Sequence, residues 1–150
     1  MTTVVYKNGI LAADSLVCYQ GKRFGLVNKV FEVKASTITK NDVVFSGSGC
    51  LMHYKLFADF LRGDSIDKEL FKSISEEGFD GIVIDKKTKE VFIYDQFLCP
   101  ETVSAEFYCL GSGGDIAKGA MLMGATPKEA IECASRFDLH TNDNIQQIKL

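Results

Sequence analysis

The chain has 150 residues, a mass of 16.6 kDa and 46% hydrophobic residues, which is enough apolar content for the core of one compact domain. Its formal net charge of -3 leaves no basic excess to neutralise phosphates or anionic lipids, so we expect neither a nucleic-acid nor a membrane partner. No stretch approaches the roughly 20 apolar residues of a membrane span, and no signal-peptide pattern opens the chain, so a cytoplasmic location is expected.

The first half of the chain begins with a predicted hairpin. Residues 3–6 and 10–13 are short β-prone runs, and Asn8-Gly9 between them is a strong signal for a two-residue hairpin turn. Apolar residues then recur at helical spacing up to Arg62-Gly63, where a helix is expected to end. The other elements predicted here are strands at 27–34 and 43–45, a helix at 51–62 and a shorter helix at 67–75.

The second half continues with another hairpin and two helices. Thr126, Pro127 and Glu129 predict a helix start, because the threonine can cap, the proline suits the first turn and the glutamate completes a capping box. Its apolar stripe is expected to contain Ala130, Ile131, Ala134 and Phe137. The remaining elements are strands at 81–84, 91–94, 107–110 and 145–150 and a helix at 115–123. Because strands and helices come in runs, we expect an α+β fold with mostly antiparallel sheets.

Lys29 lies on an apolar face of the strand expected at 27–34. Strand alternation groups it with Val27, Phe31 and Val33. A buried ammonium is costly unless a carboxylate or another acceptor meets it, and Asp14, at the end of the run 10–13, is the candidate partner. The alternative is that Lys29 extends to solvent at a strand end and that Asp14 begins a turn.

Thr2 becomes the first residue if an aminopeptidase removes Met1, and threonine is small enough for that cleavage. A hydroxyl and a free amine then share one residue. An α-amino group has an unperturbed pKa of about 7.7 to 8.0, so an appreciable fraction is the free base near neutral pH. A nearby Lys29 would lower that pKa and favour proton transfer from the hydroxyl. Taken alone, Met-Thr is also an ordinary chain start.

Five segments together resemble the β-type subunits of the proteasome and the bacterial proteasome-like peptidase HslV. Residues 2–5 (TTVV) with 9–15 (GILAADS) resemble the first hairpin of a catalytic subunit, and residues 28–31 (NKVF) resemble the strand with the active-site lysine. Residues 45–49 (FSGSG) resemble the turn that faces the scissile carbonyl, 110–114 (LGSGG) the turn into the third helix, and 138–142 the end of the fourth. The chain is much shorter than these relatives, and little room follows Phe60 for their long second helix.

The resemblance implies a set of catalytic roles. Thr2 would be the nucleophile and, through its amine, the base, while Asp14 and Lys29 would form the charge pair that tunes it. The Gly47 N–H would stabilise the tetrahedral oxyanion. A hydrogen-bonded network near the amine would consist of Ser112, Asp138 and Thr141, and the substrate side chain would lie against Val27, Phe31, Phe45 and Gly49.

The resemblance also implies a fold, an assembly and partners. The fold would be the four-layer αββα sandwich of N-terminal nucleophile hydrolases, with two antiparallel sheets between helix layers. The chains would form stacked homo-oligomeric rings that enclose the sites, with protein or peptide substrates and an ATP-dependent unfoldase as a possible partner. Two other readings stay open, namely a catalytically silent ring subunit that keeps Met1 and an N-terminal nucleophile amidase that acts on a small amide.

We expect no metal and no organic cofactor. The five cysteines have no C-x-x-C spacing, and His53 and His140 are too few for a three-histidine site, so both are interpreted as surface or packing residues. Gly111 to Gly114 open a helix and could suggest a phosphate-binding loop. The dinucleotide pattern, however, requires a glycine where Ile116 stands, and no P-loop motif occurs.

Overall fold

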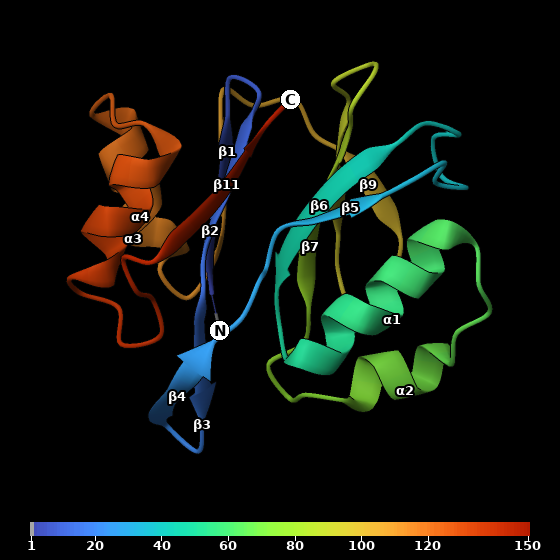
Figure 1. The fold of residues 1–150 in the computed structure, drawn as a ribbon, viewed down its shortest axis with the longest axis horizontal. Helices are drawn as coiled ribbons and strands as arrows, with labels where there is room; N and C mark the ends of the chain where they lie inside the picture. Colours follow the sequence, from blue (N-terminus) through green and yellow to red (C-terminus); the bar gives the residue numbers. More distant parts are fainter. Residues whose placement is uncertain (1) are drawn as a thin grey trace. The chain divides into compact units, whose positions relative to one another are not determined.

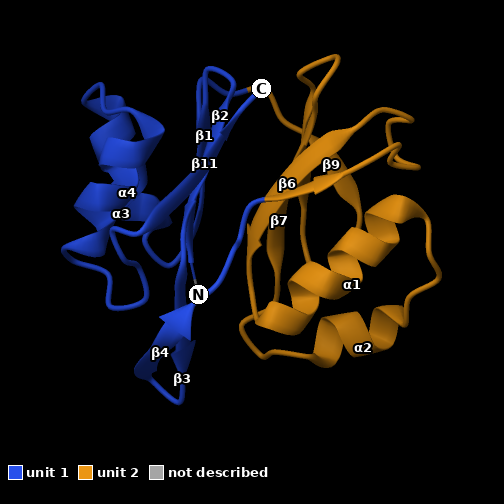
Figure 2. Ribbon diagram, viewed as in Figure 1, with its two compact units in different colours: residues 1–30, 105–150 blue, residues 31–104 orange. Residues whose placement is uncertain are grey.

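The computed structural model describes residues 2–150, so Met1, on whose removal the Thr2 prediction depends, lies outside the described residues. The chain folds as two compact units (Figure 2). Unit 1 contains the residues up to Val30 together with Ala105–Leu150, and unit 2 contains Phe31–Ser104. Within the described chain, the helices are too short or too polar to cross a membrane.

Unit 1 is built on a four-stranded antiparallel sheet (Figure 1). Its strand order is β10 (Tyr108–Gly111), β1 (Thr3–Lys7), β2 (Ile10–Asp14) and β11 (Ile145–Lys149). The predicted first hairpin is confirmed, because Asn8 and Gly9 both take positive φ angles (51° and 76°) between paired β1 and β2. The turn fixes the register that sets Thr3 beside Asp14.

Two helices, α3 (Gly114–Leu122) and α4 (Pro127–Ser135), cover one face of this sheet (Figure 1). Their small and apolar side chains pack on the strands in one buried cluster, which contains Val5, Ala12, Ala117, Met121, Ala130, Ile131 and Ala134. Burying each of the larger aliphatic side chains contributes about 1.5 to 3 kcal/mol. The many alanines let the helix backbones approach the sheet closely, which brings the residues around both helix ends near β1.

The start of α4 follows the prediction and its end does not. Thr126 caps the helix and forms the expected capping box with Glu129, an arrangement that contributes about 1 kcal/mol. The helix ends at Ser135, so Phe137 lies beyond the last turn and is 72% exposed. The predicted place of Phe137 on the apolar stripe is therefore wrong, because helical spacing no longer applies to it.

A second hairpin in unit 1 was not predicted. β3 (Leu16–Tyr19) and β4 (Lys22–Leu26) pair with each other as a separate two-stranded sheet. Their turn is Gln20-Gly21, both at positive φ, but Gln-Gly is a weaker turn signal than Asn-Gly. Tyr19, Phe24 and Leu26 on this hairpin are exposed, so its sequence lacks the regular alternation of apolar and polar residues that predicts a half-buried strand.

The strand predicted at 27–34 is only partly present. Residues 27–30 belong to no strand, and β5 covers Phe31–Val33 alone. The side chain of Gln146 takes the place of a neighbouring strand, because it accepts a hydrogen bond from Lys29 N and donates one to Val27 O. The predicted alternation of burial nevertheless holds, since Lys29 and Val33 are buried while Asn28 and Glu32 are exposed.

Unit 2 has a five-stranded antiparallel sheet and two helices (Figure 1). The strand order is β5, β6 (Val43–Ser48), β7 (Asp80–Asp85), β8 (Val91–Tyr94) and the unpredicted β9 (Pro100–Thr102). Helix α1 (Leu51–Arg62) ends at the left-handed Gly63, as predicted, and α2 (Lys68–Ser73) has six residues. An aromatic core that includes Phe45, Phe57, Phe71 and Phe79 joins both helices to the sheet.

Candidate functional site

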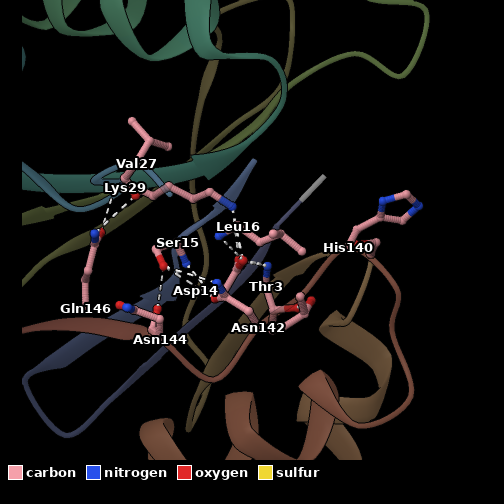
Figure 3. Close-up of polar contacts among 12 residues, drawn as sticks. Thr3, Asp14, Ser15, Leu16, Val27, Lys29, His140, Asn142, Asn144 and Gln146 are labelled. Atoms are coloured by element: carbon pink, nitrogen blue, oxygen red, sulfur yellow. Dashed lines mark hydrogen bonds and ion pairs between the residues drawn. The ribbon is translucent and has the colours of Figure 1, made fainter. Parts of the chain in front are cut away.

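Lys29 and Asp14 form a buried ion pair in unit 1 (Figure 3). The Lys29 Nζ lies 3.2 Å from each carboxylate oxygen of Asp14, and the two side chains are 2% and 0% exposed. The pairing expected from the sequence is therefore present. An ammonium and a carboxylate that are both removed from water require each other, because losing either would leave an uncompensated charge inside the unit.

Backbone groups complete the coordination of Asp14. Its Oδ1 accepts a hydrogen bond from Thr3 N at 2.9 Å, and its Oδ2 accepts one from Leu16 N at 2.8 Å. Burial raises the pKa of Asp14, while the Lys29 charge and these hydrogen bonds act against that rise. Burial likewise lowers the pKa of Lys29, opposed by the charge of Asp14. The pair thus holds a lysine whose ammonium is easier to deprotonate than one in water.

Gln146 fixes the backbone that carries Lys29. From β11, its Oε1 accepts from Lys29 N at 2.7 Å, and its Nε2 donates to Val27 O at 3.1 Å (Figure 3). Both polar groups of one amide are therefore used to hold an irregular segment beside the sheet. This role could not be predicted, because Gln146 is one of two consecutive glutamines in a strand 117 residues away from Lys29.

A chain of hydroxyl and carboxylate contacts runs from Ser112 to the same pair. Ser112 Oγ donates to Asp138 Oδ2 at 2.7 Å, and Thr141 Oγ1 donates to the same oxygen at 2.5 Å. The Thr3 and Thr141 hydroxyls lie 2.6 Å apart. Because Thr141 has only one hydroxyl proton and gives it to Asp138, Thr3 must donate to Thr141.

These contacts connect Ser112, Asp138 and Thr141, the three residues that the resemblance grouped as a network, and add Thr3 to them. Burial acts to raise the pKa of Asp138, but the hydrogen bonds from Thr141 and Ser112 outweigh it and hold that pKa below its ordinary value. Asp138 therefore stays ionised, and its charge also favours the ammonium form of Lys29. Thr3 was not singled out from the sequence, although it follows Thr2 directly.

Thr2 is the residue before β1 and is 1% exposed. The next residue, Thr3, connects to both parts of the cluster, through its N–H to Asp14 and through its hydroxyl to Thr141. The backbone at the start of β1 is therefore held from two sides. Such double anchoring is what a reactive group at position 2 would require, since its geometry depends on the residue that follows.

Gly113 makes the close packing of this network possible. A Cβ at this position would lie 2.1 Å from Thr3 Oγ1 and 3.0 Å from Thr141 Oγ1. We expect Gly113→Ala to lower the free energy of unfolding by about 1 to 3 kcal/mol, because it forces the hydroxyls apart. Gly119→Ala in α3 is the matched control, with nothing within 4 Å of the new methyl group, and should raise stability by about 0.5 to 1 kcal/mol. Urea denaturation measures both, and equal effects would contradict the prediction.

Unit 2 contains the other residues expected at the site, Gly47, Gly49, Phe31 and Phe45. A Cβ on Gly47 would lie 2.7 Å from Asp80 O, and one on Gly49 would lie 2.7 Å from His53 Nδ1, so neither position has room for a side chain. Phe31 is partly buried and stacks on Phe45 with ring centroids 5.1 Å apart. Phe45 itself is fully buried, so its ring supports Phe31 in the core of the unit.

The polar cluster of unit 1 does not have the composition of a metal centre. Within residues 2–150, no group of three or more histidine, cysteine, aspartate and glutamate side chains is arranged to hold a metal ion. Its acidic members, Asp14 and Asp138, are already saturated by Lys29, backbone N–H groups and hydroxyls. The arrangement is suited to holding charge and protons close to the start of β1.

No protein-family model and no curated protein matches the sequence. The structure, in contrast, is similar to the crystal structure of eukaryotic HslV from Trypanosoma brucei. The similarity has a TM-score of 0.64 and covers 98% of this chain and 97% of that chain, at 16% sequence identity. The chain has an HslV-like fold.

The similarity to HslV confirms the expected resemblance at the level of the fold, with antiparallel sheets and helices in the expected order. The catalytic roles assigned to Thr2, Lys29 and Gly47 stay predictions at this identity. The described residues add the geometry of the charge pair and of the hydroxyl network, which are connected through Thr3 in unit 1.

Proposed function

We propose that the chain is an N-terminal-threonine endopeptidase subunit of a proteasome-like or HslV-like ring, active after removal of Met1. The buried Asp14–Lys29 pair, tied through Thr3 to the residue that would become the N-terminus, is the observation that supports this proposal most strongly. Replacing a buried ion pair by a well-packed apolar pair is often neutral or stabilising, so a pair in this position is not required for stability alone.

In the proposed reaction, the Thr2 hydroxyl oxygen attacks the carbonyl carbon of a peptide bond while its proton moves to the free amine of Thr2. The carbon–nitrogen bond then breaks, and the leaving amine takes that proton. The product is an ester between Thr2 and the acyl part of the substrate. Water then attacks the ester carbonyl and gives a proton to the amine. The amine passes this proton to the departing Thr2 oxygen, so the carboxylic acid is released and the hydroxyl and free amine of Thr2 are restored. The Gly47 N–H is proposed to stabilise the oxyanion in both steps.

Lys29 contributes through its charge. A cation close to an amine disfavours the ammonium form of that amine and lowers its pKa, so a larger fraction of Thr2 is ready to accept a proton. Asp14 holds Lys29 in place and keeps it charged. Asp138, ionised by its hydroxyl donors, adds a second negative charge that supports the ammonium of Lys29.

The proposal includes an arrangement and a setting for the enzyme. The two sheets would pack face to face in a four-layer αββα sandwich, and the chains would form stacked homo-oligomeric rings in the cytoplasm. Protein or peptide substrates would reach the enclosed sites with the help of an ATP-dependent unfoldase. These features come from the HslV-like resemblance, and analytical ultracentrifugation of the purified chain tests the ring directly.

Intact-mass analysis combined with a fluorogenic-peptide assay tests the function. We expect a species lighter by one methionine that cleaves short peptides. Retained Met1 without activity would instead indicate a silent ring subunit. A processed, monomeric protein that hydrolyses a small amide and leaves peptides intact would indicate an amidase. Either of these two results contradicts the proposal.

The same peptides address the residue that precedes the cleaved bond. The substrate pocket is proposed to be lined by Val27, Phe31 and Gly49, and Phe45 supports the ring of Phe31. Because this lining is apolar, the enzyme should prefer an apolar side chain before the cleaved bond. Peptides that differ only at this position should give the highest kcat/KM for leucine or phenylalanine. A clear preference for acidic or basic residues would count against these residues as the pocket.

A further inference from the structure

The turn before α1 in unit 2 is held by the first turn of the helix itself. His53 is fully buried, its Nδ1 lies 3.1 Å from Cys50 N and its Nε2 lies 3.0 Å from Phe71 O. The hydroxyl of Tyr54 donates to Gly47 O at 2.5 Å. Two consecutive helix residues thus fix the two ends of the Gly47–Cys50 turn, one through a carbonyl and the other through an N–H.

The two contacts of His53 define its protonation state. Cys50 N is a backbone donor, so Nδ1 must accept, and Phe71 O is an acceptor, so Nε2 must carry the hydrogen. Only the neutral imidazole with hydrogen on Nε2 satisfies both contacts. The protonated ring has hydrogen on both nitrogens, so it would present a donor to the Cys50 N–H and lose that hydrogen bond.

The surroundings of His53 also favour the neutral ring. It lies in the first turn of α1, where the helix dipole disfavours a positive charge, and its ring packs on Phe71 and Phe79 at centroid distances of 4.8 and 5.3 Å. Burial lowers the pKa of His53, against the hydrogen bond to Phe71 O, which acts to raise it.

The ionisable groups near the ring do not compensate a charge on it. The groups in contact with His53 are neutral, namely the Cys50 thiol and N–H before α1, the Gly49 backbone, the Phe71 ring and carbonyl of α2, and the Phe79 ring before β7. On α2, Lys72 pairs with Glu69 at 3.4 Å, and Asp80 at the start of β7 is exposed. Among residues 2–150, no carboxylate forms an ion pair with His53.

The turn has little freedom to accommodate a change in the ring. A Cβ on Gly49 would lie 2.7 Å from His53 Nδ1, so the Gly49 backbone packs directly on the imidazole. Phe79, which contacts the same ring, would lie 2.9 Å from a Cβ on Gly47. A movement of His53 would therefore be transmitted to Gly47 through both the backbone of the turn and the Phe79 ring.

We propose that His53 is a positioning residue whose neutral ring holds the Gly47–Cys50 turn in place, and that protonation of the ring releases the turn. The consequence for catalysis rests on the proposed function, in which the Gly47 N–H stabilises the oxyanion. Mild acid then lowers activity by disordering this turn, independently of the protonation of the Thr2 amine.

Amide hydrogen exchange by NMR tests the release of the turn without any assay of activity. Burial lowers the pKa of His53, so the titration must extend below the ordinary histidine range. Between about pH 7.5 and 4.5 we expect the protection factor of the Cys50 amide to fall about tenfold relative to that of Val83 in β7, which corresponds to the free energy of one hydrogen bond. Ring nitrogen shifts should report hydrogen on Nε2 at the higher pH. His53→Gln retains an acceptor at the capping-box position and should keep the Cys50 amide protected throughout, whereas His53→Leu should leave it unprotected at both pH values.

Two results would overturn the proposal. In one, His53 titrates and the protection of the Cys50 amide stays constant. In the other, His53→Leu protects that amide as well as the native ring does. Because the core amide of Val83 is measured in the same sample, global unfolding of a variant is recognised by its effect on both amides.

Measurements of kcat distinguish the role of His53 from the proposed peptidase function. The ratio of kcat at about pH 4.5 to kcat at about pH 7.5 should be about tenfold larger in His53→Gln than in the native chain. Tyr54→Phe, which releases Gly47 O, should lower kcat, while Tyr94→Phe, which removes a buried hydroxyl without a hydrogen-bond partner, should retain activity.

The combined outcomes can be told apart. If the chain has no peptidase activity but its amide exchange follows the expected pattern, the role of His53 is supported and the proposed function is contradicted. An active enzyme whose kcat ratio and Cys50 protection are the same in His53→Gln as in the native chain would support the proposed function and contradict the role of His53.

Discussion

Thr2→Ala is expected to abolish peptide cleavage, with kcat lowered by about 10⁴-fold or more, because it removes the proposed nucleophile and leaves only binding and oxyanion stabilisation. Thr2→Ser keeps both a hydroxyl and an amine on the first residue and should retain measurable activity. Both variants keep a small residue after Met1, so processing should proceed in each. Intact mass confirms this before the kinetics are compared.

The neighbouring threonine provides a matched control. Thr3→Val preserves the shape of the side chain and removes the hydroxyl that donates to Thr141. We expect it to lower kcat by no more than about 100-fold, since a hydrogen bond of a few kcal/mol is lost and the nucleophile stays. If Thr2→Ala kept more than about a tenth of native activity, or if Thr3→Val were the more damaging substitution, Thr2 would not be the nucleophile.

Features of the site could be predicted from the sequence where one residue imposes a strong local requirement. Lys29 on an apolar face required a carboxylate, and the nearest acid at the end of a buried strand, Asp14, is the one that meets it. The Asn8-Gly9 turn fixed the register of the first hairpin for a similar reason, because few residue pairs adopt two positive φ angles.

The hydrogen bonds that could not be predicted join residues that are far apart in the sequence. Thr3 meets Thr141 across 138 residues, and Gln146 meets Lys29 across 117. A threonine or a glutamine is compatible with many positions in a strand, so its residue type alone does not predict a distant hydrogen-bond partner. The same Gln146 contact explains why residues 27–30 are not a strand, since an amide side chain supplies the hydrogen bonds that a ladder would give.

The position of His53 on a helix could be predicted from the sequence, whereas its contacts could not. Two histidines were interpreted as surface or packing residues, and His53 is fully buried in the aromatic core of unit 2. Its place on an amphipathic helix could be predicted, but its hydrogen bonds could not. They depend on a cap residue, Cys50, that lacks the usual side-chain oxygen, so that the ring nitrogen supplies the acceptor for the helix start.

Asp14→Ala is expected to lower the free energy of unfolding by about 3 to 5 kcal/mol, because it leaves the Lys29 ammonium buried without a partner. It also removes the acceptor for two backbone donors, Thr3 N and Leu16 N, which adds to the cost. Lys29→Met keeps the length of the side chain and leaves the carboxylate with those two donors. It should therefore cost less than Asp14→Ala.

The double variant Asp14→Ala/Lys29→Met distinguishes an ion pair from two independent packing sites. With both charges removed, no buried charge is left uncompensated, so the loss of stability should be smaller than the sum of the two single losses by at least about 1 kcal/mol. Urea denaturation of the four proteins gives this coupling free energy. Additive losses would show that the two side chains do not stabilise each other.

An exposed pair in unit 2 provides the reference for this measurement. Lys55 and Asp59 are one turn apart on α1, and the Lys55 Nζ lies 3.1 Å from the Asp59 Oδ2. The lysine side chain is 78% exposed. Their coupling in the equivalent cycle should be about 0.5 kcal/mol or less and should weaken in salt, because water screens both charges. The coupling between Asp14 and Lys29 should instead persist in salt, since the buried charges are screened by protein groups alone. The same burial that makes the pair costly to form keeps a positive charge fixed beside the start of β1, which is what the proposed base at Thr2 requires.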